Sequence, residues 1–298
     1  MRAVLPYHQY VKEFIMTERK ILILGGKGKT GRRVAQRLAN LGYTHIRIGS
    51  RSETPAFDWE KPDSWPDVIE GMETVYITFQ PDLAIPAAVE TIEKFTSLAT
   101  EKGVAKMVLL SGRGEKEAQI CEQAVMNNAK KWTIVRASWF NQNFSESVFL
   151  EPILAGHVAL PRAETLEPFI DADDIADVVA EALTDDKHNG QIYELTGPRL
   201  VTFPQAIAEI AQASGRVIQF QSLTLEENVN LLKEYKLPGD YIWLVNYLFT
   251  EVLDGRNATV TSDIEKVLGR KATDFSEFVQ ANVSVWSHVA QSEEKQVS

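Results

Sequence analysis

A glycine-rich turn between an apolar run and an amphipathic segment constrains this chain more than any other feature. The apolar run covers residues 21–24, and the amphipathic segment, which is predicted to be a helix, begins near Lys29. Gly26, Gly28 and Gly31 have the spacing G-x-G-x-x-G. Glycine permits a tight strand-to-helix turn, lets a phosphate approach the N–H groups of a helix N-terminus, and lets the helix lie close to the strand. The stretch therefore predicts a dinucleotide-binding turn.

The same stretch admits alternatives. Gly25, Gly28 and Gly31 also have the spacing G-x-x-G-x-x-G, and a purely structural turn would use glycine as well. The tripeptide at 28–30 resembles the end of a nucleoside-triphosphate phosphate loop, but that motif requires a glycine where this chain has Ile23. We therefore reject the phosphate loop. The residues predicted to bind the cofactor at the turn are Gly25, Gly26, Gly28, Lys29, Thr30 and Gly31.

Strand and helix patterns alternate through the first half of the sequence. Predicted strands cover residues 21–24, 45–48, 57–59, 74–79, 104–110 and 132–136. Predicted helices cover residues 29–41, 62–70, 86–102 and 115–128. Repeated strand–helix units imply parallel strands with right-handed crossovers. The predicted fold class is therefore α/β, with a Rossmann-type doubly wound parallel sheet.

The second half of the chain mixes short strands with helices, which predicts a smaller α/β substrate lobe. Its strands are predicted at 191–195 and 217–221, and its helices at 204–214, 225–236 and 239–253, with a further helix that follows residues 170–175 and ends at 183. Residues 264–268 and 275–285 complete the lobe. No low-complexity linker separates the halves, so the lobe should be built on the same core, with strands and helices interleaved. The predicted division is an N-terminal extension at 1–15, a dinucleotide-binding Rossmann domain at 16–143, the smaller lobe at 144–290 and a disordered tail at 291–298.

Composition and charge exclude several classes of protein. The 298 residues carry a net charge of -10, which argues against a general nucleic-acid binder, because such proteins need a basic face. Cys121 is the single cysteine and is expected to pack in the core, so a reducing, cytoplasmic location is predicted. No apolar run approaches about 18 residues, which excludes a membrane-spanning helix. His45, His157 and His188 are scattered without ligand spacing, and no metal site is predicted.

The end of the second predicted strand indicates which dinucleotide binds. An NAD site usually has an acidic residue near this position, which binds the ribose hydroxyls. Here the residues are Ser50, Arg51 and Ser52. An arginine suits a 2′-phosphate, because it can form paired charge-assisted hydrogen bonds. Arg51 therefore predicts NADP(H), and the alternative is a surface arginine paired with Glu53.

Residues at the ends of two further strands are also predicted to face the cofactor, because ligands of open α/β sheets bind at the carboxyl ends of strands. Phe79 and Gln80 are expected against the adenosine or its ribose. Ser111 and Gly112 are expected near the nicotinamide ribose. Lys116 follows shortly afterwards and is expected to be solvated, with contact to a phosphate or the substrate as the alternative.

The sixth predicted strand and the residues after it resemble a known family. Arg136, residues 139–144 (Trp-Phe-Asn-Gln-Asn-Phe), the glycine turn and residues 169–176 are similar to the NmrA-like group of atypical short-chain dehydrogenase/reductases. The similarity covers most of residues 16–285, and the ergot-alkaloid-type (agroclavine or festuclavine) dehydrogenases look most similar. Ala137 stands where many members have proline, which should change loop rigidity but not cofactor binding. The resemblance implies an NADP(H)-binding protein.

A second departure from the wider superfamily concerns the chemistry. Typical short-chain reductases carry Tyr-x-x-x-Lys about a dozen residues after the serine of the fifth strand, and this tyrosine protonates the developing alkoxide. Residues 120–131 contain no tyrosine, so carbonyl reduction by that route is disfavoured and no catalytic residue is assigned. One alternative is a non-enzymatic, redox-sensing NADP(H)-binding regulator that acts through a partner protein. The other is hydride transfer to an acceptor that needs little acid help. The ergot-type resemblance supports an iminium ion as that acceptor, and a quinone or enone is a further alternative.

Trp139, Phe140 and Asn143 are the predicted substrate residues, because an aromatic face stabilises a cation and holds a flat ring. The alternative for them is an aromatic wedge in the core. The acidic balance is compatible with a small, cationic substrate. The aspartates within residues 171–174 are expected to cap a helix rather than bind a metal. The sequence thus predicts an NADP(H)-dependent oxidoreductase that transfers hydride to a small organic acceptor.

Overall fold

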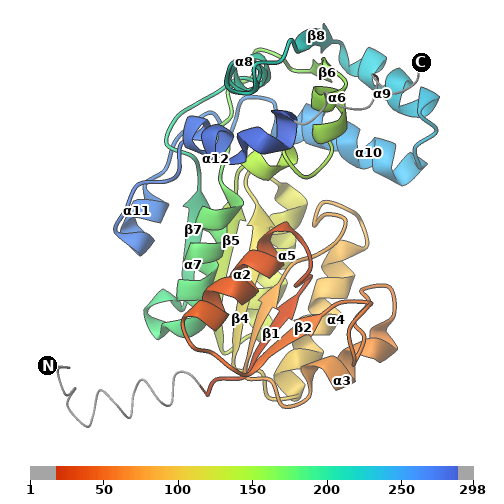
Figure 1. The fold of residues 1–298 in the computed structure, drawn as a ribbon. Coiled ribbons are helices and arrows are strands. Elements are labelled where there is room, and N and C mark those ends of the chain that lie inside the picture. The colour runs from red at the N-terminus through yellow and green to blue at the C-terminus, as the bar shows by residue number, and fades with distance from the viewer. Residues whose placement is uncertain (1–17, 288–298) are drawn as a thin grey trace, which may run out of the picture. The chain divides into compact units, whose positions relative to one another are not determined.

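The computed structural model describes residues 18–287, and Figure 1 labels its helices and strands. The main sheet has six strands in the order β2-β1-β3-β4-β5-β7. β1 pairs in parallel with β2 and β3, and β3 pairs in parallel with β4. This order confirms the predicted doubly wound sheet. The strands are β1 (Ile21–Leu24), β2 (Ile46–Gly49), β3 (Thr74–Ile77), β4 (Lys106–Gly112), β5 (Lys131–Ala137) and β7 (Gln191–Leu195).

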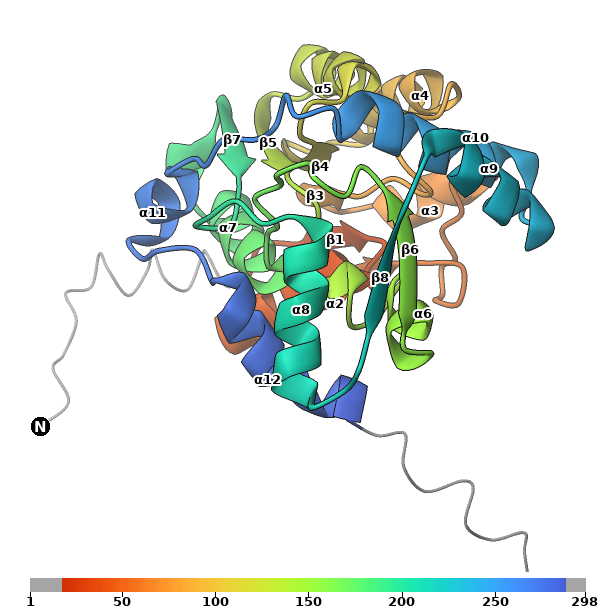
Figure 2. The ribbon, with the colours of Figure 1, turned by 90° about the horizontal axis from the view of Figure 1, so that it is seen from above.

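Helices cover both faces of this sheet. Figures 1 and 2 show α2 and α7 on one face and α4 and α5 on the other. Arg37 of α2 pairs with Asp177 of α7, with 2.8 Å between Nε and Oδ1. β1 and β3 are buried along their whole length, because helices exclude water from both of their faces. The helices are α2 (Lys29–Asn40), α3 (Trp65–Ile69), α4 (Ala88–Glu101), α5 (Lys116–Asn128) and α7 (Ala172–Thr184), with short 3₁₀ turns at Pro62–Ser64 and Asp186–His188.

Residues 57–59, predicted as a strand, form none in the described structure, so that prediction is wrong. The aromatic side chains of this segment pack with one another instead. The rings of Phe57 and Trp59 meet edge to face with 4.9 Å between their centroids. The indole Nε1 of Trp59 donates to the carbonyl of Thr78 at 3.1 Å, which fastens the segment just past the end of β3. The apolar pattern therefore reflects aromatic packing and not a sheet ladder.

The chain divides into two compact units whose segments interleave. Within the described residues, the first unit contains 18–112, 116–136 and 175–194, and the second contains 113–115, 137–174 and 195–287. The chain thus returns from the second unit to the first, where most of α7 packs and where β7 joins the six-stranded sheet. Each unit is described by itself below.

The second unit holds a small sheet in which β6 (His157–Pro161) and β8 (Gln219–Leu223) run parallel. Its core is rich in phenylalanine, and the rings of Phe144 and Phe169 meet edge to face at 5.3 Å. The indole of Trp286 donates to the carbonyl of Phe144 at 2.9 Å, which fastens the last helix to this core. Its helices are α6 (Leu150–Leu154), α8 (Phe203–Ser214), α9 (Leu225–Glu234), α10 (Gly239–Tyr247), α11 (Asp263–Leu268) and α12 (Phe275–Ser287), with a π-helical turn at Leu248–Val252 and a 3₁₀ turn at Asn141–Asn143.

The N-terminal extension predicted at 1–15 and the tail predicted at 291–298 lie outside the described residues. Within residues 18–287, no helix is long and apolar enough to cross a membrane. No group of three or more His, Cys, Asp or Glu side chains in that range is placed to hold a metal ion. Cys121 of α5 is buried in the core of the first unit, as predicted.

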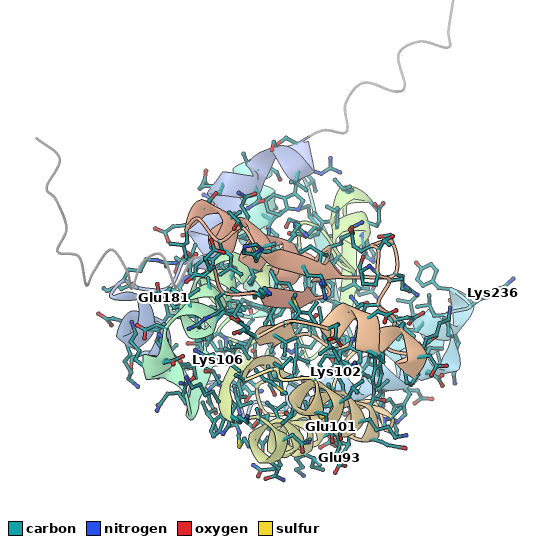
Figure 3. The ribbon with its side chains drawn as sticks, turned by 90° about the horizontal axis from the view of Figure 1, so that it is seen from below. Glu93, Glu101, Lys102, Lys106, Glu181 and Lys236 are labelled. Atoms are coloured by element: carbon teal, nitrogen blue, oxygen red, sulfur yellow. The ribbon has the colours of Figure 1, made fainter. Side chains whose placement is uncertain are left out.

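A buried lysine lies at the amino end of β4, on the face of the molecule seen in Figure 3. Only 2% of the Lys106 surface is exposed, and its Nζ donates to the Asp185 carbonyl at 2.8 Å and to Asp186 Oδ1 at 3.3 Å. Burial lowers the pKa of Lys106 from 10.5 to about 8, because the charged form loses its hydration. Attraction to the Asp186 carboxylate offsets this loss only in part.

This lysine should make the folding stability depend on alkaline pH. Between pH 8 and 10.5 the unfolded chain binds more protons at this position than the folded chain, so stability should rise with pH, by roughly 3 kcal/mol in total. Lys106→Met should abolish that rise. Urea unfolding of both proteins from pH 7.5 to 10.5 measures it, with the exposed Lys130→Met as the matched control. If the free energy of unfolding rises equally in Lys106→Met and in the unmutated protein, Lys106 is not the source of the pH dependence.

Candidate functional site

The turn after β1 requires glycine at its first position. Gly25 has a φ of +63°, a conformation that residues with a Cβ rarely adopt. A Cβ on Gly25 would lie 2.3 Å from Thr78 Oγ1, which itself donates to the Leu24 carbonyl at 3.0 Å. The N–H of Gly25 continues the pairing with β2, because it donates to the carbonyl of Gly49 at 3.0 Å. The chain therefore turns sharply out of the sheet just where the strand ends.

The last glycine of the motif brings helix α2 against the turn. A Cβ on Gly31 would lie 2.3 Å from the Gly25 carbonyl oxygen and 2.8 Å from the Gly26 Cα. These are backbone atoms, so no side-chain movement could make room. Gly26 has a similar constraint, because its Cβ would lie 2.6 Å from the Ile48 side chain. Close helix-to-strand packing is the role that the spacing predicted for these residues.

Gly28 begins helix α2 without a side-chain cap. It has an extended backbone (φ −77°, ψ 179°), and its carbonyl accepts the Arg32 N–H at 3.2 Å. The N–H groups of the first helical turn have no partners within a helix, and an anion is attracted to them by the helix dipole. A Cβ on Gly28 would project beside this group of donors, 3.1 Å from the Gly25 carbonyl oxygen and 4.0 Å from Gln80 Nε2. The turn therefore has the form of a phosphate cradle that a side chain would fill.

A hydroxyl in the first turn of α2 completes the cradle. Thr30 is buried, and its Oγ1 accepts a hydrogen bond from the Tyr76 hydroxyl at 3.0 Å. Burial raises the pKa of Tyr76 above its ordinary value, so Tyr76 stays neutral and remains a donor. The proton of Thr30 is then available to an acceptor such as a phosphate oxygen.

The loop after β2 lies next to the glycine turn. Lys27 Nζ pairs with Glu53 Oε1 at 2.7 Å and donates to Ser52 Oγ at 2.8 Å, and Ser50 and Ser52 are 3.2 Å apart at their hydroxyls. Glu53 thus takes Lys27 as its partner, and no Arg51–Glu53 ion pair forms among the described residues. Arg51 is exposed.

The predicted residues after β3 point in different directions. The ring of Phe79 packs against Trp59, with 5.0 Å between ring centroids, and belongs to the aromatic cluster beside the core. Gln80 lies near the turn, with its Nε2 4.0 Å from the position that a Cβ on Gly28 would occupy. The structure therefore brings Gln80 to the cradle and gives Phe79 a packing role.

The hydroxyl of Ser111, near the carboxyl end of β4, belongs to a buried ionic network that the sequence analysis missed. Ser111 Oγ donates to Glu122 Oε1 at 2.6 Å. Arg136 of β5 donates to both oxygens of Glu122, at 2.9 Å from Nε and 2.7 Å from Nη2, and to Glu194 Oε1 at 3.2 Å. Glu122 is 1% exposed, and its hydrogen bond raises the pKa of Arg136. Gly112 ends β4 and is partly exposed.

One signal for this network was present in the sequence. The stretch that lacks the family tyrosine contains Glu122, a charged residue on the apolar side of a helix whose neighbours Ala118, Cys121 and Val125 are buried. A carboxylate in such a position requires a cation, because an unpaired charge is very costly to bury. The strand arginine that carried the family resemblance, Arg136, supplies it.

The predicted substrate residues lie in the second unit. Trp139 is half-buried and stacks on Phe149, with 6.4 Å between centroids and 4° between planes. It also contacts Phe203 and Phe249. Phe140 bridges to Ile170 through the backbone. Phe140 and Asn143, like Trp139, remain partly exposed and thus able to meet a ligand.

The aspartates at the start of α7 have structural partners. Asp171 Oδ1 accepts the Asp173 N–H at 2.8 Å, which confirms the predicted capping at this position. Asp174 instead accepts from Thr273 N at 2.7 Å and pairs with Arg270 at 2.6 Å. These aspartates therefore cap the start of α7 and connect it to the loop that contains Arg270 and Thr273.

Glu167 is a buried carboxyl that the sequence analysis did not single out. It is 1% exposed, and its Oε1 accepts the backbone N–H of Trp139 at 3.4 Å. Burial raises the pKa of Glu167 to about 7, and the charge of Arg113 opposes this only in part. Glu167 therefore changes its charge near neutral pH, next to the predicted substrate residues.

Glu167 should make stability fall as the solution becomes neutral. Its pKa is higher folded than unfolded, so the folded chain binds more protons between pH 4.5 and 7 and loses roughly 3 kcal/mol of stability across that range. Glu167→Gln mimics the neutral acid and should remove this loss. Urea unfolding at pH 5 and 8 tests it, with the exposed Glu164→Gln as control. The assignment fails if Glu167→Gln and the unmutated protein lose the same stability between those values.

A shallow cavity of about 350 Å³ opens at the opposite edge of the sheet, between Lys20, His45, Arg47 and Glu70. These residues flank the amino ends of β1, β2 and β3. Ligands of open α/β sheets bind at the carboxyl ends, so the glycine turn is the better candidate site.

The chain has curated relatives along almost its whole length. It is 30% identical over 285 residues to the uncharacterized oxidoreductase YesF of Bacillus subtilis, with 92% of this chain and 98% of the relative covered. It is 28% identical to the festuclavine dehydrogenase of Aspergillus fumigatus, covering 89% of this chain and 98% of the relative. It is 27% identical to an NAD(P)H azoreductase of Xenophilus azovorans, covering 89% and 99%. No family model matches the chain.

Solved structures share the fold. The Citrobacter triphenylmethane reductase in complex with NADP(H) superposes with a TM-score of 0.74 at 17% identity, over 88% of this chain and 99% of that one. The curated relatives define this protein as an oxidoreductase of a class that uses NAD(P)H. The chain belongs to the NmrA-like family of atypical short-chain dehydrogenase/reductases, as the sequence motifs predicted. Its named relatives include NAD(P)H-dependent enzymes.

Proposed function

We propose that this protein is an NADP(H)-dependent reductase that transfers hydride to a small organic acceptor without a tyrosine acid. The uncapped start of α2 at Gly28, enclosed by Gly25 and Gly31, carries this proposal. Its backbone donors and the Thr30 hydroxyl are suited to a pyrophosphate. When bound there, NADPH supplies a hydride and leaves as NADP⁺. Gln80, beside the turn, adds a further polar contact.

The choice of NADP(H) over NAD(H) rests on the loop after β2. Arg51 is exposed, and Glu53, its neighbouring acid in the sequence, pairs with Lys27. The loop therefore offers an arginine and two serine hydroxyls to a 2′-phosphate, and no free carboxylate to the ribose of NAD(H).

The proposed acceptor is an iminium ion. Hydride addition to an iminium carbon gives a neutral amine, so no proton has to be delivered, and residues 120–131 contain no tyrosine to deliver one. Similarity to festuclavine and agroclavine dehydrogenases supports the same class. A quinone or enone is the alternative, since the fold is also that of an Escherichia coli NADPH-dependent quinone oxidoreductase (TM-score 0.70, 18% identity, 88% of this chain and 99% of that one). Trp139, Phe140 and Asn143 remain the predicted substrate contacts.

Cofactor titration followed by turnover tests this function. Fluorescence titration should show NADPH binding more tightly than NADH. NADPH oxidation at 340 nm is then followed with cyclic iminium, quinone and enone panels, and the iminium compounds should give the highest kcat/KM. Failure to bind either cofactor would reject the assignment. Tight NADPH binding with no turnover in any panel would favour the regulator instead.

A further inference from the structure

The hydroxyl of Ser111 has a fixed hydrogen-bonding polarity. Glu122 accepts two hydrogen bonds from the Arg136 guanidinium, which holds it as a carboxylate with no proton to give. The 2.6 Å bond between Ser111 Oγ and Glu122 Oε1 must therefore use the serine proton. Only the lone pairs of Ser111 remain for another partner.

Those lone pairs have no partner within the protein. Among residues 18–287, no N–H or O–H group donates to Ser111 Oγ. Ser111 is 4% exposed and lies one residue before the end of β4, at the edge of the sheet where ligands of this fold bind. Ser111 Oγ is already satisfied as a donor, and it keeps an acceptor site that an N–H donor of a ligand can use.

The network also makes Ser111 a stronger acceptor than an ordinary serine. Donation to a carboxylate polarises the hydroxyl and increases the negative charge on Oγ. A carbonyl oxygen or developing oxyanion would be repelled by such a group, whereas an N–H donor or a cation would be attracted. This polarity is the opposite of the donor that carbonyl reduction requires.

We infer that Ser111 accepts a hydrogen bond from an N–H group of the ligand, and that the Glu122–Arg136 pair fixes this polarity. The inference rests on the proposed function and deepens it. The N–H donor has two sources with the same chemistry, namely the carboxamide of a bound nicotinamide and the protonated nitrogen of an iminium substrate. Glu122 and Arg136 act as positioning residues, since they work through Ser111.

The experiment compares donors with matched compounds that lack the N–H. For the cofactor, binding of NADP⁺ is compared with its 3-acetylpyridine analogue, in which a methyl group replaces the amide NH₂. For the substrate, kcat/KM of a protonated cyclic imine is compared with that of its N-methyl iminium and of a quinone of similar size. Each comparison uses the unmutated protein, Ser111→Ala and Ser111→Thr, and thermal unfolding checks that the variants fold.

The unmutated protein should favour the N–H compound about tenfold in at least one pair, the expected effect of one buried hydrogen bond. Ser111→Ala should reduce that preference to less than about threefold, and Ser111→Thr should restore it. The readout is the ratio within each pair, because loss of a cofactor contact at Ser111 would lower all NADPH-dependent rates together. A preference in the cofactor pair identifies the carboxamide as the donor, and one in the substrate pair identifies the imine nitrogen.

Two results would overturn the inference. One is the absence of an N–H preference in both pairs in the unmutated protein, a test that needs no variant. The other is a selective loss of quinone reduction in Ser111→Ala, which would make Ser111 a donor. Glu122→Gln gives an independent check, because it releases the serine proton and should shift the quinone-to-imine kcat/KM ratio toward quinone. If NADPH binds and is oxidised in these assays, the proposed function stands even where the inference fails.

Discussion

Gly28→Ala should weaken NADP(H) binding at least about thirtyfold while the protein stays folded. The alanine methyl group would project into the cradle at the start of α2 and displace a phosphate from its backbone donors, whose hydrogen bonds to a charged group are each worth about 1.5–3 kcal/mol. Gly28 has an extended backbone that any residue can adopt, and its Cβ would be 3.1 Å from the Gly25 carbonyl oxygen, a tight contact that a shift of a few tenths of an ångström relieves, so the cost to folding should be smaller than at Gly31. Isothermal titration with NADP⁺ and urea unfolding measure the two quantities.

Gly31→Ala is the matched control, since it adds the same methyl group where the backbone leaves no room. Its Cβ would lie 2.3 Å from the Gly25 carbonyl oxygen, so it should lower the free energy of unfolding by roughly 2–3 kcal/mol. Undiminished NADP⁺ affinity in Gly28→Ala would show that the cradle is only a structural turn.

Arg51→Glu should reverse the cofactor preference. The substitution removes a charge-assisted contact to the 2′-phosphate and adds a repulsion, so NADPH affinity should fall about a hundredfold. NADH should bind as well as before or better, because glutamate can accept hydrogen bonds from its ribose hydroxyls. Competitive titration of both cofactors gives the ratio directly.

Lys94→Glu controls for net charge, because it makes the same change on the exposed side of α4, where Lys94 pairs with Glu90. It should leave the NADPH-to-NADH ratio within about twofold. If Arg51→Glu behaves like Lys94→Glu, Arg51 is not the residue that distinguishes the two cofactors.

The sheet and the glycine turn could be predicted because local sequence determines them. The apolar runs of β1 and β4 mark strands buried on both faces, and the glycine spacing marks a turn that a Cβ would block. The aromatic segment at 57–59 was misread because its apolar residues pack with Trp65 and Phe95 rather than with a strand. Short apolar runs do not distinguish these outcomes.

The side-chain networks could not be predicted in the same way, because they join residues from distant elements. Ser111, Glu122 and Arg136 come from two strands and a helix, and only their spatial proximity shows that the serine proton is committed. The raised pKa of Glu167 likewise follows from burial, which its charge in the sequence would not suggest. The motifs predicted a dinucleotide-binding protein, whereas the direction of the Ser111–Glu122 hydrogen bond could be seen only in the fold.

Isotope transfer tests the central claim most directly. The two C4-deuterated forms of NADPH, one for each face of the nicotinamide ring, are incubated with the protein and a cyclic iminium, and the amine product is analysed by mass spectrometry. The account predicts one deuterium at the former iminium carbon from one of the two forms. Amine free of deuterium with both forms, or NADPH that binds at the turn and is never oxidised, would contradict it.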